Sequence, residues 1–376
     1  AGGILTDLSK AFDCLNHELL IAKLDAYGFG VEACKFILNY LKNRKQKTKV
    51  GEAFSKWLET KWGVPQGSIL GPLLFNLFIN DIFFFIEESY IANYADDNTP
   101  YTIGKNLDDL LSNLEKETNS VLKWFKLNEM KSHDDKCHLI VPNELNAVVR
   151  LGQEVIPAED SVTLLGVIID NKLDFSSHVE FLLKKGNQKL HALARISKYV
   201  SRDKLKLIMN TFIKSQFNYC PLLWMFHSRT LNNRINRLHE RALRIVYKNE
   251  ELSFQELLEL SGDVTVHQKN LQRLATEMYK VRNDIAPIPF QKLFDEGSNT
   301  YNLRNQNTWA LPKMRTVIYG TETIRYRGPL IWDSLSNDIK ESRTLQIFKS
   351  KIKSIGKIDC TCRLCKTFIP NLGFLT

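Results

Sequence analysis

Two adjacent aspartates interrupt an apolar strand pattern at Tyr94-Ala95-Asp96-Asp97. Residues 91–103 alternate enough to predict a β-hairpin, with Asp96, Asp97 and Asn98 at its tip. Neighbouring carboxylates repel each other, so a tight turn suits them because both can project into solvent or toward a metal ion. Taken alone, the motif is equally compatible with an ordinary Asp-Asp-Asn turn, and a second acidic element is needed to decide.

That element is Asp7, which ends the short buried strand predicted over residues 4–8. A carboxylate at a strand end beside a carboxylate hairpin is what a two-metal site needs. Oxygen ligands suit Mg²⁺, which keeps several waters and takes one or two carboxylates plus substrate phosphates. Two such ions about 4 Å apart stabilise both the attacking and the leaving oxygen of a phosphoryl transfer. The alternative is that Asp7 is a helix cap or loop residue.

A third element is the segment Gly63-Val-Pro-Gln-Gly-Ser-Ile-Leu-Gly-Pro72. Its glycines and prolines predict a tight, rigid turn before an apolar helix. A glycine there lets another backbone or a nucleotide approach closely, and Gln66 could hydrogen-bond a base or a sugar. A helix N-terminus punctuated by glycines is the other interpretation.

Together these segments resemble palm motifs A, B and C of the reverse transcriptases of non-LTR (LINE-type) retrotransposons, most of all the jockey group. The matching residues are Asp7-Leu-Ser-Lys-Ala-Phe12-Asp13, Gly63-Val-Pro-Gln-Gly67 and Tyr94-Ala-Asp96-Asp97. The joint match is specific because three independent motifs occur in the right order and spacing. Weaker similarity over 124–137, 164–167 and 217–224 extends it along nearly the whole chain, with much less specificity beyond residue 230.

The resemblance implies an RNA-directed DNA polymerase that adds dNTPs to the 3′-hydroxyl of a DNA primer on an RNA template. It implies that Asp7 and Asp96 are the main ligands of two Mg²⁺ (or Mn²⁺) ions and that Asp97 is the third catalytic carboxylate. The backbone carbonyl of Leu8 would add a ligand. Related nucleotidyltransferases, such as RNA-dependent RNA polymerases or telomerase-like enzymes, are a rival interpretation, as is a non-catalytic nucleic-acid-binding remnant of a retroelement.

Other roles follow from the same resemblance. Phe12 lies five positions after Asp7, where the family places a steric gate that excludes a 2′-hydroxyl; simple core packing is the alternative. Lys136 matches a lysine that could protonate or neutralise the leaving pyrophosphate, although a solvated surface lysine would look the same. The pocket near the nascent base pair would be shaped by Pro65, Gln66 and Gly67.

The fold class predicted is α+β: a palm with an antiparallel sheet and packed helices, then a mainly helical, thumb-like module and a C-terminal region. The expected boundaries are 1–170, 171–283 and 284–376. Expected helices cover 17–27, 32–43, 67–86, 107–127, 176–199, 204–217, 231–247, 266–282 and 345–354. Expected strands cover 4–8, two within 50–62, 137–141, 148–156 and 163–169, and residues 284–330 look irregular.

One predicted helix carries two parallel stripes between residues 231 and 245. Leu231, Ile235, Leu238, Ala242 and Ile245 form an apolar stripe. Beside it, the spacing of four arginines predicts a basic stripe that could line a groove for phosphates. These arginines are Arg234, Arg237, Arg241 and Arg244. A solvated basic face is the alternative.

The tail carries Cys360-Thr-Cys362-Arg-Leu-Cys365. Three close thiolates could contribute to a Zn²⁺ site, which needs a fourth ligand. No Cys follows Cys365 and no His lies beyond His267. An exposed, reduced cysteine cluster is the alternative.

The net charge of +9 fits an anionic partner such as nucleic acid or an acidic membrane surface. The most apolar run, 67–86, is interrupted by Asn76, Asn80 and Asp81, so a buried helix is expected rather than a membrane span. Reduced cysteines favour an intracellular protein, expected in cytoplasm and nucleus. Because the chain opens inside a strand, we expect a fragment without polymerase fingers that is weak or inactive alone. Its oligomeric state is not indicated.

Overall fold

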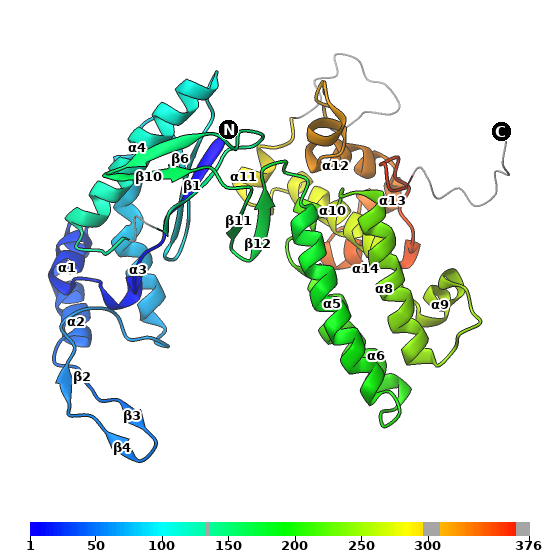
Figure 1. Cartoon of the computed structure of the whole chain (residues 1–376), viewed down its shortest axis with the longest axis horizontal. Coiled ribbons are helices and arrows are strands. Elements are labelled where there is room, and N and C mark those ends of the chain that lie inside the picture. Colours follow the sequence, from blue (N-terminus) through cyan, green and yellow to red (C-terminus); the bar gives the residue numbers. More distant parts are fainter. Residues whose placement is uncertain (133–135, 296–308, 366–376) are drawn as a thin grey trace. The chain divides into compact units, whose positions relative to one another are not determined.

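The computed structural model describes residues 1–132, 136–295 and 309–365, and divides into two compact units, Ala1–Leu173 and Asp174–Thr376 (Figure 1). Asp135, which belongs to the segment of weaker family similarity, lies outside the described residues. Within the described ranges, no helix combines the length and the apolar character that crossing a bilayer requires.

An antiparallel sheet forms the centre of the first unit, in the order β6-β7-β1-β8. The strands are β1 (Gly2–Leu5), β6 (Tyr90–Tyr94), β7 (Asp97–Thr102) and β8 (His138–Ile140). Ile4 of the central strand is fully buried against Leu110 and Leu114 of α4 (Leu107–Leu127), which has the predicted bounds. The antiparallel sheet with packed helices confirms the predicted α+β class, and it places the end of β1 beside the β6–β7 hairpin.

A second hydrophobic cluster lies among the helices of this unit: α1 (His17–Ala26), α2 (Val31–Leu41), α3 (Leu70–Ile79) and part of α4. The expected helix over 67–86 is shorter than predicted, because a 3₁₀ turn replaces it over Asn80–Phe85. The Lys23 ammonium bonds the Asp81 carboxylate at 2.6 Å, and the Trp124 indole N–H donates to the same carboxylate oxygen at 3.2 Å. These polar contacts connect three helical segments beneath the sheet.

Short two-stranded ribbons complete the first unit. An exposed arm extends beyond α2 (Figure 1) and holds two strand pairs, whereas only two short strands were predicted here, over 50–62. Its strands are β2 (Lys45–Gln46), β3 (Lys49–Val50), β4 (Ala53–Phe54) and β5 (Leu58–Glu59). Two further ribbons lie where single strands were predicted over 148–156 and 163–169, because a turn divides each segment into a two-stranded hairpin. They are β9 (Val148–Leu151) with β10 (Glu154–Pro157), and β11 (Ser161–Leu164) with β12 (Val167–Asp170).

The second unit is helical, as predicted, and its first cluster packs α5 (Ser176–Ile196) against α8 (Arg229–Tyr247), which lie side by side. The smaller helices here are α6 (Arg202–Ile208), α7 (Pro221–Trp224) and α9 (Phe254–Ser261). The single helix predicted over 204–217 is wrong in detail, because α6 passes into a π turn at Met209–Ile213 and a 3₁₀ turn at Lys214–Asn218. Residue periodicity does not distinguish these hydrogen-bond patterns.

A second cluster of this unit surrounds α10 (Val266–Arg282), whose predicted bounds are confirmed. It includes residues of α12 (Ile324–Asp333) and α14 (Leu345–Ile355), so residues on both sides of position 283 share one core. The remaining helices are α11 (Ile288–Gln291) and α13 (Asn337–Lys340). The expectation that 284–330 is irregular is therefore only partly correct: α11, a π turn over Val317–Thr321 and the start of α12 lie there.

Candidate active site

The acidic hairpin forms where it was predicted, with a different tip. Tyr94 pairs with Asp97, so the two-residue loop consists of Ala95 and Asp96, with Ala95 at a φ of +54°. Asp97 is the first residue of β7, and the Asn98 after it is fully buried. The carboxylate of Asp96 therefore comes from the turn, and that of Asp97 from the adjoining strand end.

Asp7 is brought to this hairpin by backbone pairing. The amide and the hydroxyl of Thr6 both donate to the carbonyl of Asn98, each at 2.9 Å. The Asn98 side-chain amide in turn donates to the Asp96 carbonyl at 2.9 Å. Because Asp7 directly follows Thr6, the three acidic residues converge on the same end of the sheet.

The electrostatics of Asp97 are consistent with this convergence. Burial raises the pKa of its carboxyl group, and the carboxylates of Asp96 and Asp7 raise it further. Like charges at short range disfavour the ionised form. The mutual repulsion and the hard oxygen donors are what a divalent cation would relieve and bind, so the residues present fit the implied Mg²⁺ chemistry.

The aspartates form an open cluster. Asp7 and Asp97 are exposed, and Asp96 is half-buried. Within the described part of the chain, the ligand atoms of these three aspartates do not all lie within 4.8 Å of one another. A looser arrangement suits two ions about 4 Å apart better than it suits one ion held by all three residues. The Lys136 ammonium lies 4.0 Å from the Asp7 carboxylate, and both side chains are about half exposed.

Phe12 combines features of both interpretations made from the sequence. Its ring stacks on Phe75 with centroids 4.4 Å apart and packs at the edge of the helical core, yet it is only half-buried. Phe12 thus has a supported face and an accessible one, which is what a steric gate requires.

Leu8, whose carbonyl was predicted to add a metal ligand, buries its side chain and pairs with Ser132 across an isolated antiparallel bridge.

The glycine-rich loop is joined directly to the loop that carries Phe12. The Val64 amide donates to the Phe12 carbonyl at 2.9 Å, and the Gly63 amide donates to the Leu15 carbonyl at 2.7 Å. Gly63 has a φ of +81°, and a Cβ there would lie 2.7 Å from the Cα of Asp13. Only glycine fits this conformation and this approach.

The far end of that loop is more accessible. Gln66, predicted to contact a base or sugar, donates its side-chain amide to the Asp13 carboxylate at 2.9 Å. The Pro65 carbonyl accepts the Ser68 hydroxyl at 2.7 Å. Gly67 has a φ of +80°, and a Cβ built on it would meet nothing within 4 Å. The turn predicted from sequence is therefore present, and its open side lies at Gly67.

The four arginines of α8 do not share one environment. The predicted apolar stripe packs into the core, with Ile245 partly buried at its edge. Arg234 pairs with Glu180 at 3.0 Å, and the half-buried Arg244 pairs with Glu240 and donates to backbone carbonyls after the helix. Arg237 and Arg241 are exposed, and no ion pair or hydrogen bond joins either to a described residue.

A residue that sequence reasoning missed is His267, at the start of α10. Its Nε2 lies 3.3 Å from the Cys362 sulfur, and Cys365 completes a group whose ligand atoms all lie within 4.8 Å of one another. The His and the cysteines are separated by 95 residues or more, so no local spacing could indicate the pairing. The three tail cysteines are therefore not an exposed cluster, since Cys362 is fully buried.

Comparison with known proteins concerns mainly the first unit. Residues 2–169 match the family model described as reverse transcriptase (RNA-dependent DNA polymerase). The RNA-directed DNA polymerase from mobile element jockey of Drosophila melanogaster is 28% identical over 260 residues. The probable RNA-directed DNA polymerase from transposon BS of the same species is 23% identical over 258 residues. Each alignment covers 65% of this chain and 28% of the relative.

The chain thus spans about 28% of the length of these curated relatives. Among solved structures, the apo telomerase from Candida tropicalis aligns with 71% of this chain and 46% of that chain at 13% identity, with a TM-score of 0.37. A TM-score this low supports no conclusion about fold or function.

Proposed function

We propose that this chain supplies the catalytic palm of an RNA-directed DNA polymerase from a mobile element, because residues 2–169 match the family model described as reverse transcriptase (RNA-dependent DNA polymerase). The convergence of Asp7, Asp96 and Asp97 at one end of the sheet carries the proposal. The reaction is attack of a primer 3′-hydroxyl on the α-phosphate of a dNTP, which forms a phosphodiester bond and releases pyrophosphate.

Two Mg²⁺ or Mn²⁺ ions, when bound, would lower the pKa of the 3′-hydroxyl and neutralise the triphosphate. Asp7 and Asp96 would hold them, with the Leu8 carbonyl as an additional oxygen donor. The pKa of Asp97 is raised by burial and by the carboxylates of Asp96 and Asp7, and bound cations would offset that repulsion. Lys136, within 4.0 Å of Asp7, is suitably placed to offset negative charge on the leaving pyrophosphate.

The loops around the acidic cluster would bind the nucleotide. The accessible face of Phe12 would lie under the incoming sugar and leave no room for a 2′-hydroxyl, and Phe75 would hold the ring in place. Pro65, Gln66 and Gly67 would shape the pocket near the nascent base pair. The Gln66 amide would have to leave Asp13 to contact a base or sugar, while Gly67 is already accessible.

Template and primer are nucleic acids, and the exposed guanidinium groups of Arg237 and Arg241 are available for phosphates. Arg234 would have to exchange its bond to Glu180, and Arg244 has a role in closing the end of α8. An enzyme that copies a mobile element's transcript needs access to RNA and to chromosomes, so both cytoplasm and nucleus are expected.

Primer extension on an RNA template with Mg²⁺ tests the proposal. The comparison is between the unaltered chain, Asp96→Asn, and Asp25→Asn as a control at an exposed aspartate of α1. Because the chain alone is expected to be weak or inactive, we expect weak extension at most, and any extension should depend on Asp96 and not on Asp25. Extension by Asp96→Asn at the parent rate would refute the assigned role. Mn²⁺ binding, followed by electron paramagnetic resonance, provides a second readout, and an unaltered chain that binds no Mn²⁺ would also refute the site.

A further inference from the structure

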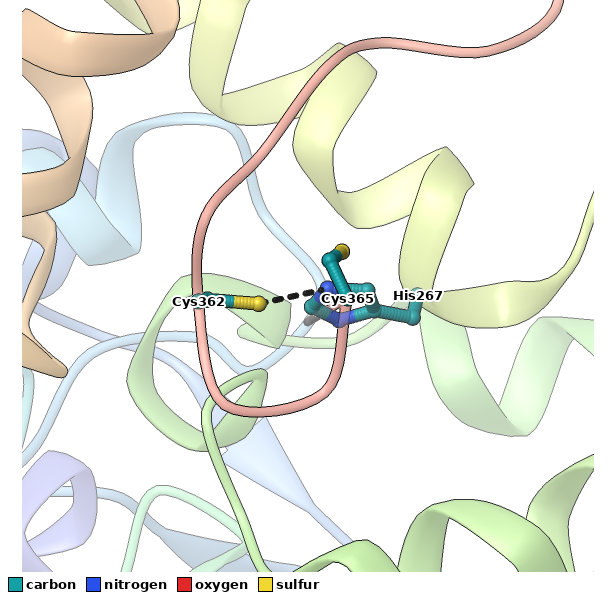
Figure 2. Close-up of side chains that lie close together, drawn as sticks. All are labelled: His267, Cys362 and Cys365. Atoms are coloured by element: carbon teal, nitrogen blue, oxygen red, sulfur yellow. Dashed lines mark hydrogen bonds between the residues drawn. The ribbon is translucent and has the colours of Figure 1, made fainter. Parts of the chain in front are cut away.

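Two cysteines of the tail and one histidine of α10 form a compact group (Figure 2). His267 Nε2 lies 3.3 Å from the Cys362 sulfur, and the ligand atoms of His267, Cys362 and Cys365 all lie within 4.8 Å of one another. The Cys365 amide donates to the Cys362 carbonyl at 3.0 Å, which closes the turn between the two cysteines. Two cysteines separated by two residues on a tight turn are a common half of a tetrahedral zinc site.

Cys360 supplies a third sulfur beside this group. The Cys362 amide donates to the Cys360 sulfur at 3.3 Å, so the third cysteine is held at the same turn. Cys360, Cys365 and His267 also line one cavity of about 320 Å³. The three tail cysteines and His267 together make four possible ligands, and His267 is the one that the tail by itself lacks.

The burial of these groups favours a bound ion. His267 is 6% exposed and Cys362 is 0% exposed. Among the described residues, none forms a hydrogen bond with the buried Nδ1 atom of His267, and Nε2 faces a thiol, which is a weak partner. A buried imidazole with so little compensation is costly. Coordination of Nε2 by a metal ion would replace its weak contact with the thiol by a strong bond.

The scaffold around the ligands is held by contacts that do not involve them. The Ile358 amide donates to the Gln268 side chain at 2.9 Å, and the Gln272 side chain donates to the Gly356 carbonyl at 2.9 Å. Arg363 donates to two backbone carbonyls, and Leu364 is buried. The tail is thus attached to α10 on one side of the ligands and packed on the other, so their positions are preorganised.

We propose that His267, Cys360, Cys362 and Cys365 bind one Zn²⁺ ion that links the tail to the start of α10. Thiolate and imidazole ligands select zinc over hard cations such as Mg²⁺, and four protein ligands leave no open position, which is typical of a structural site. The ion would join two segments about 95 residues apart in the chain and close one side of the second unit. The inference does not depend on the proposed polymerase function.

Metal content of the purified full chain is the first test. We expect one Zn²⁺ per chain by mass spectrometry after dialysis against metal-free buffer. Replacement by Co²⁺ should give thiolate charge-transfer bands and the intense visible bands of tetrahedral coordination. A chain that binds no zinc when zinc is added under reducing conditions would overturn the proposal, as would cobalt spectra of an octahedral oxygen site.

Variants then assign the ligands. His267→Ala, Cys362→Ser and Cys365→Ser should each lose stoichiometric zinc, and Cys360→Ser should lose it or shift the cobalt bands. His191→Ala on the exposed side of α5 and Cys220→Ser are matched controls in the same unit, and both should retain the ion. Unchanged zinc content and an unchanged cobalt spectrum in Cys360→Ser would overturn its role as the fourth ligand.

A measurement on the unaltered chain covers the case in which a variant does not fold. Under native, reducing conditions, added zinc should slow alkylation of the half-buried Cys360 and Cys365, while Cys220, also half-buried, should react at an unchanged rate. Equal alkylation of Cys360 and Cys365 with and without zinc would contradict the proposal.

Discussion

The two candidate metal centres of this chain have opposite designs. In the first unit, three aspartates lie at a strand end and a hairpin turn, with Asp7 and Asp97 exposed and charges that repel one another. In the second unit, an imidazole and thiols lie in the interior, with His267 and Cys362 buried. Hard, exposed ligands suit an ion that is exchanged and shared with a substrate. Soft, enclosed ligands suit an ion that stays.

Different parts of the fold determine the geometry of the two sites. The positions of the aspartates depend on strand pairing and on the buried junction at which the backbones of Gly63 and Val64 bond to those of Leu15 and Phe12. Exposed carboxylates that repel one another cannot hold themselves in place. The thiol group depends on a tail attached along one helix. If this comparison is correct, substitutions should affect the two centres separately.

The largest expected effect separates the centres by chemistry. Asp96→Asn should lower the rate of primer extension by about 10³-fold, because it removes a charge that acts on the reacting phosphates. Its zinc content should not change, whereas Cys362→Ser should lose zinc and retain Mn²⁺ binding. Primer extension, zinc content and Mn²⁺ binding measured on the same preparations provide the check. A variant that loses both metals would break the comparison.

A second effect tests whether the first centre handles nucleotides. Phe12→Val should lower discrimination between dNTP and rNTP by about 10²-fold, because the ring that occupies the space of the 2′-hydroxyl is gone. Single-nucleotide incorporation gives the ratio. Phe78→Leu, at a fully buried ring of the same cluster that packs edge-on against Trp124 rather than stacking on Phe12, is the control for lost packing. Equal changes in both variants would assign Phe12 to the core alone.

A third effect tests the junction between the Gly63 loop and the loop that carries Phe12. Gly63→Ala should destabilise the first unit by about 1–3 kcal/mol more than Gly28→Ala, because only at Gly63 does the new Cβ meet backbone, 2.7 Å from Asp13 Cα. Both glycines have similar positive φ values, +81° and +87°, so backbone strain is matched. Thermal unfolding measures the difference, and equal melting temperatures would argue against a rigid junction.

The smallest effect concerns charge at Asp97. A carboxyl group whose pKa is raised on folding stabilises the fold while it is protonated. That contribution is lost as pH rises from about the ordinary value of 3.8 through the raised pKa. At neutral pH without divalent ions, Asp97→Asn should therefore melt slightly higher than the parent. The gain should be a few degrees at most, because the carboxylate is exposed and screened.

The difference between the two melting temperatures should shrink as pH falls toward 3.8, and Mg²⁺ should stabilise the parent more than the variant. Melting curves across pH, with and without Mg²⁺, test both statements. A variant that melts lower than the parent at neutral pH without metal would mean that Asp97 stabilises the fold by its charge.

Sequence patterns predicted this molecule well where the relevant signal is local. The bounds of α4 and α10 were predictable because Asn106 and Thr265 cap helices with clear apolar periodicity. The acidic hairpin was predictable from its alternation, but its turn was misplaced, since strand register decides that Asp97 pairs with Tyr94. The start of α12 was missed within a segment rich in proline, glycine and asparagine.

The sites show the same limit. The order of three family motifs was enough to predict that Asp7, Asp96 and Asp97 lie close together, as they do in the structure. The approach of His267 to the tail was not predictable, because packing of distant segments creates it. Likewise, Arg234 and Arg244 occupy the predicted stripe, but partners outside that stripe determine what each arginine binds.

One buried asparagine has consequences for the acidic cluster. Asn98 accepts both Thr6 donors at its carbonyl, donates to the Asp96 carbonyl and accepts from the Asn93 side chain at 2.6 Å. It therefore sets the spacing between two acidic strand ends without being acidic itself. A substitution of Asn98 would keep the backbone carbonyl that accepts from Thr6, but it would remove the side-chain bonds to Asp96 and from Asn93. All three aspartates can therefore be present while the turn that carries Asp96 is no longer held in place.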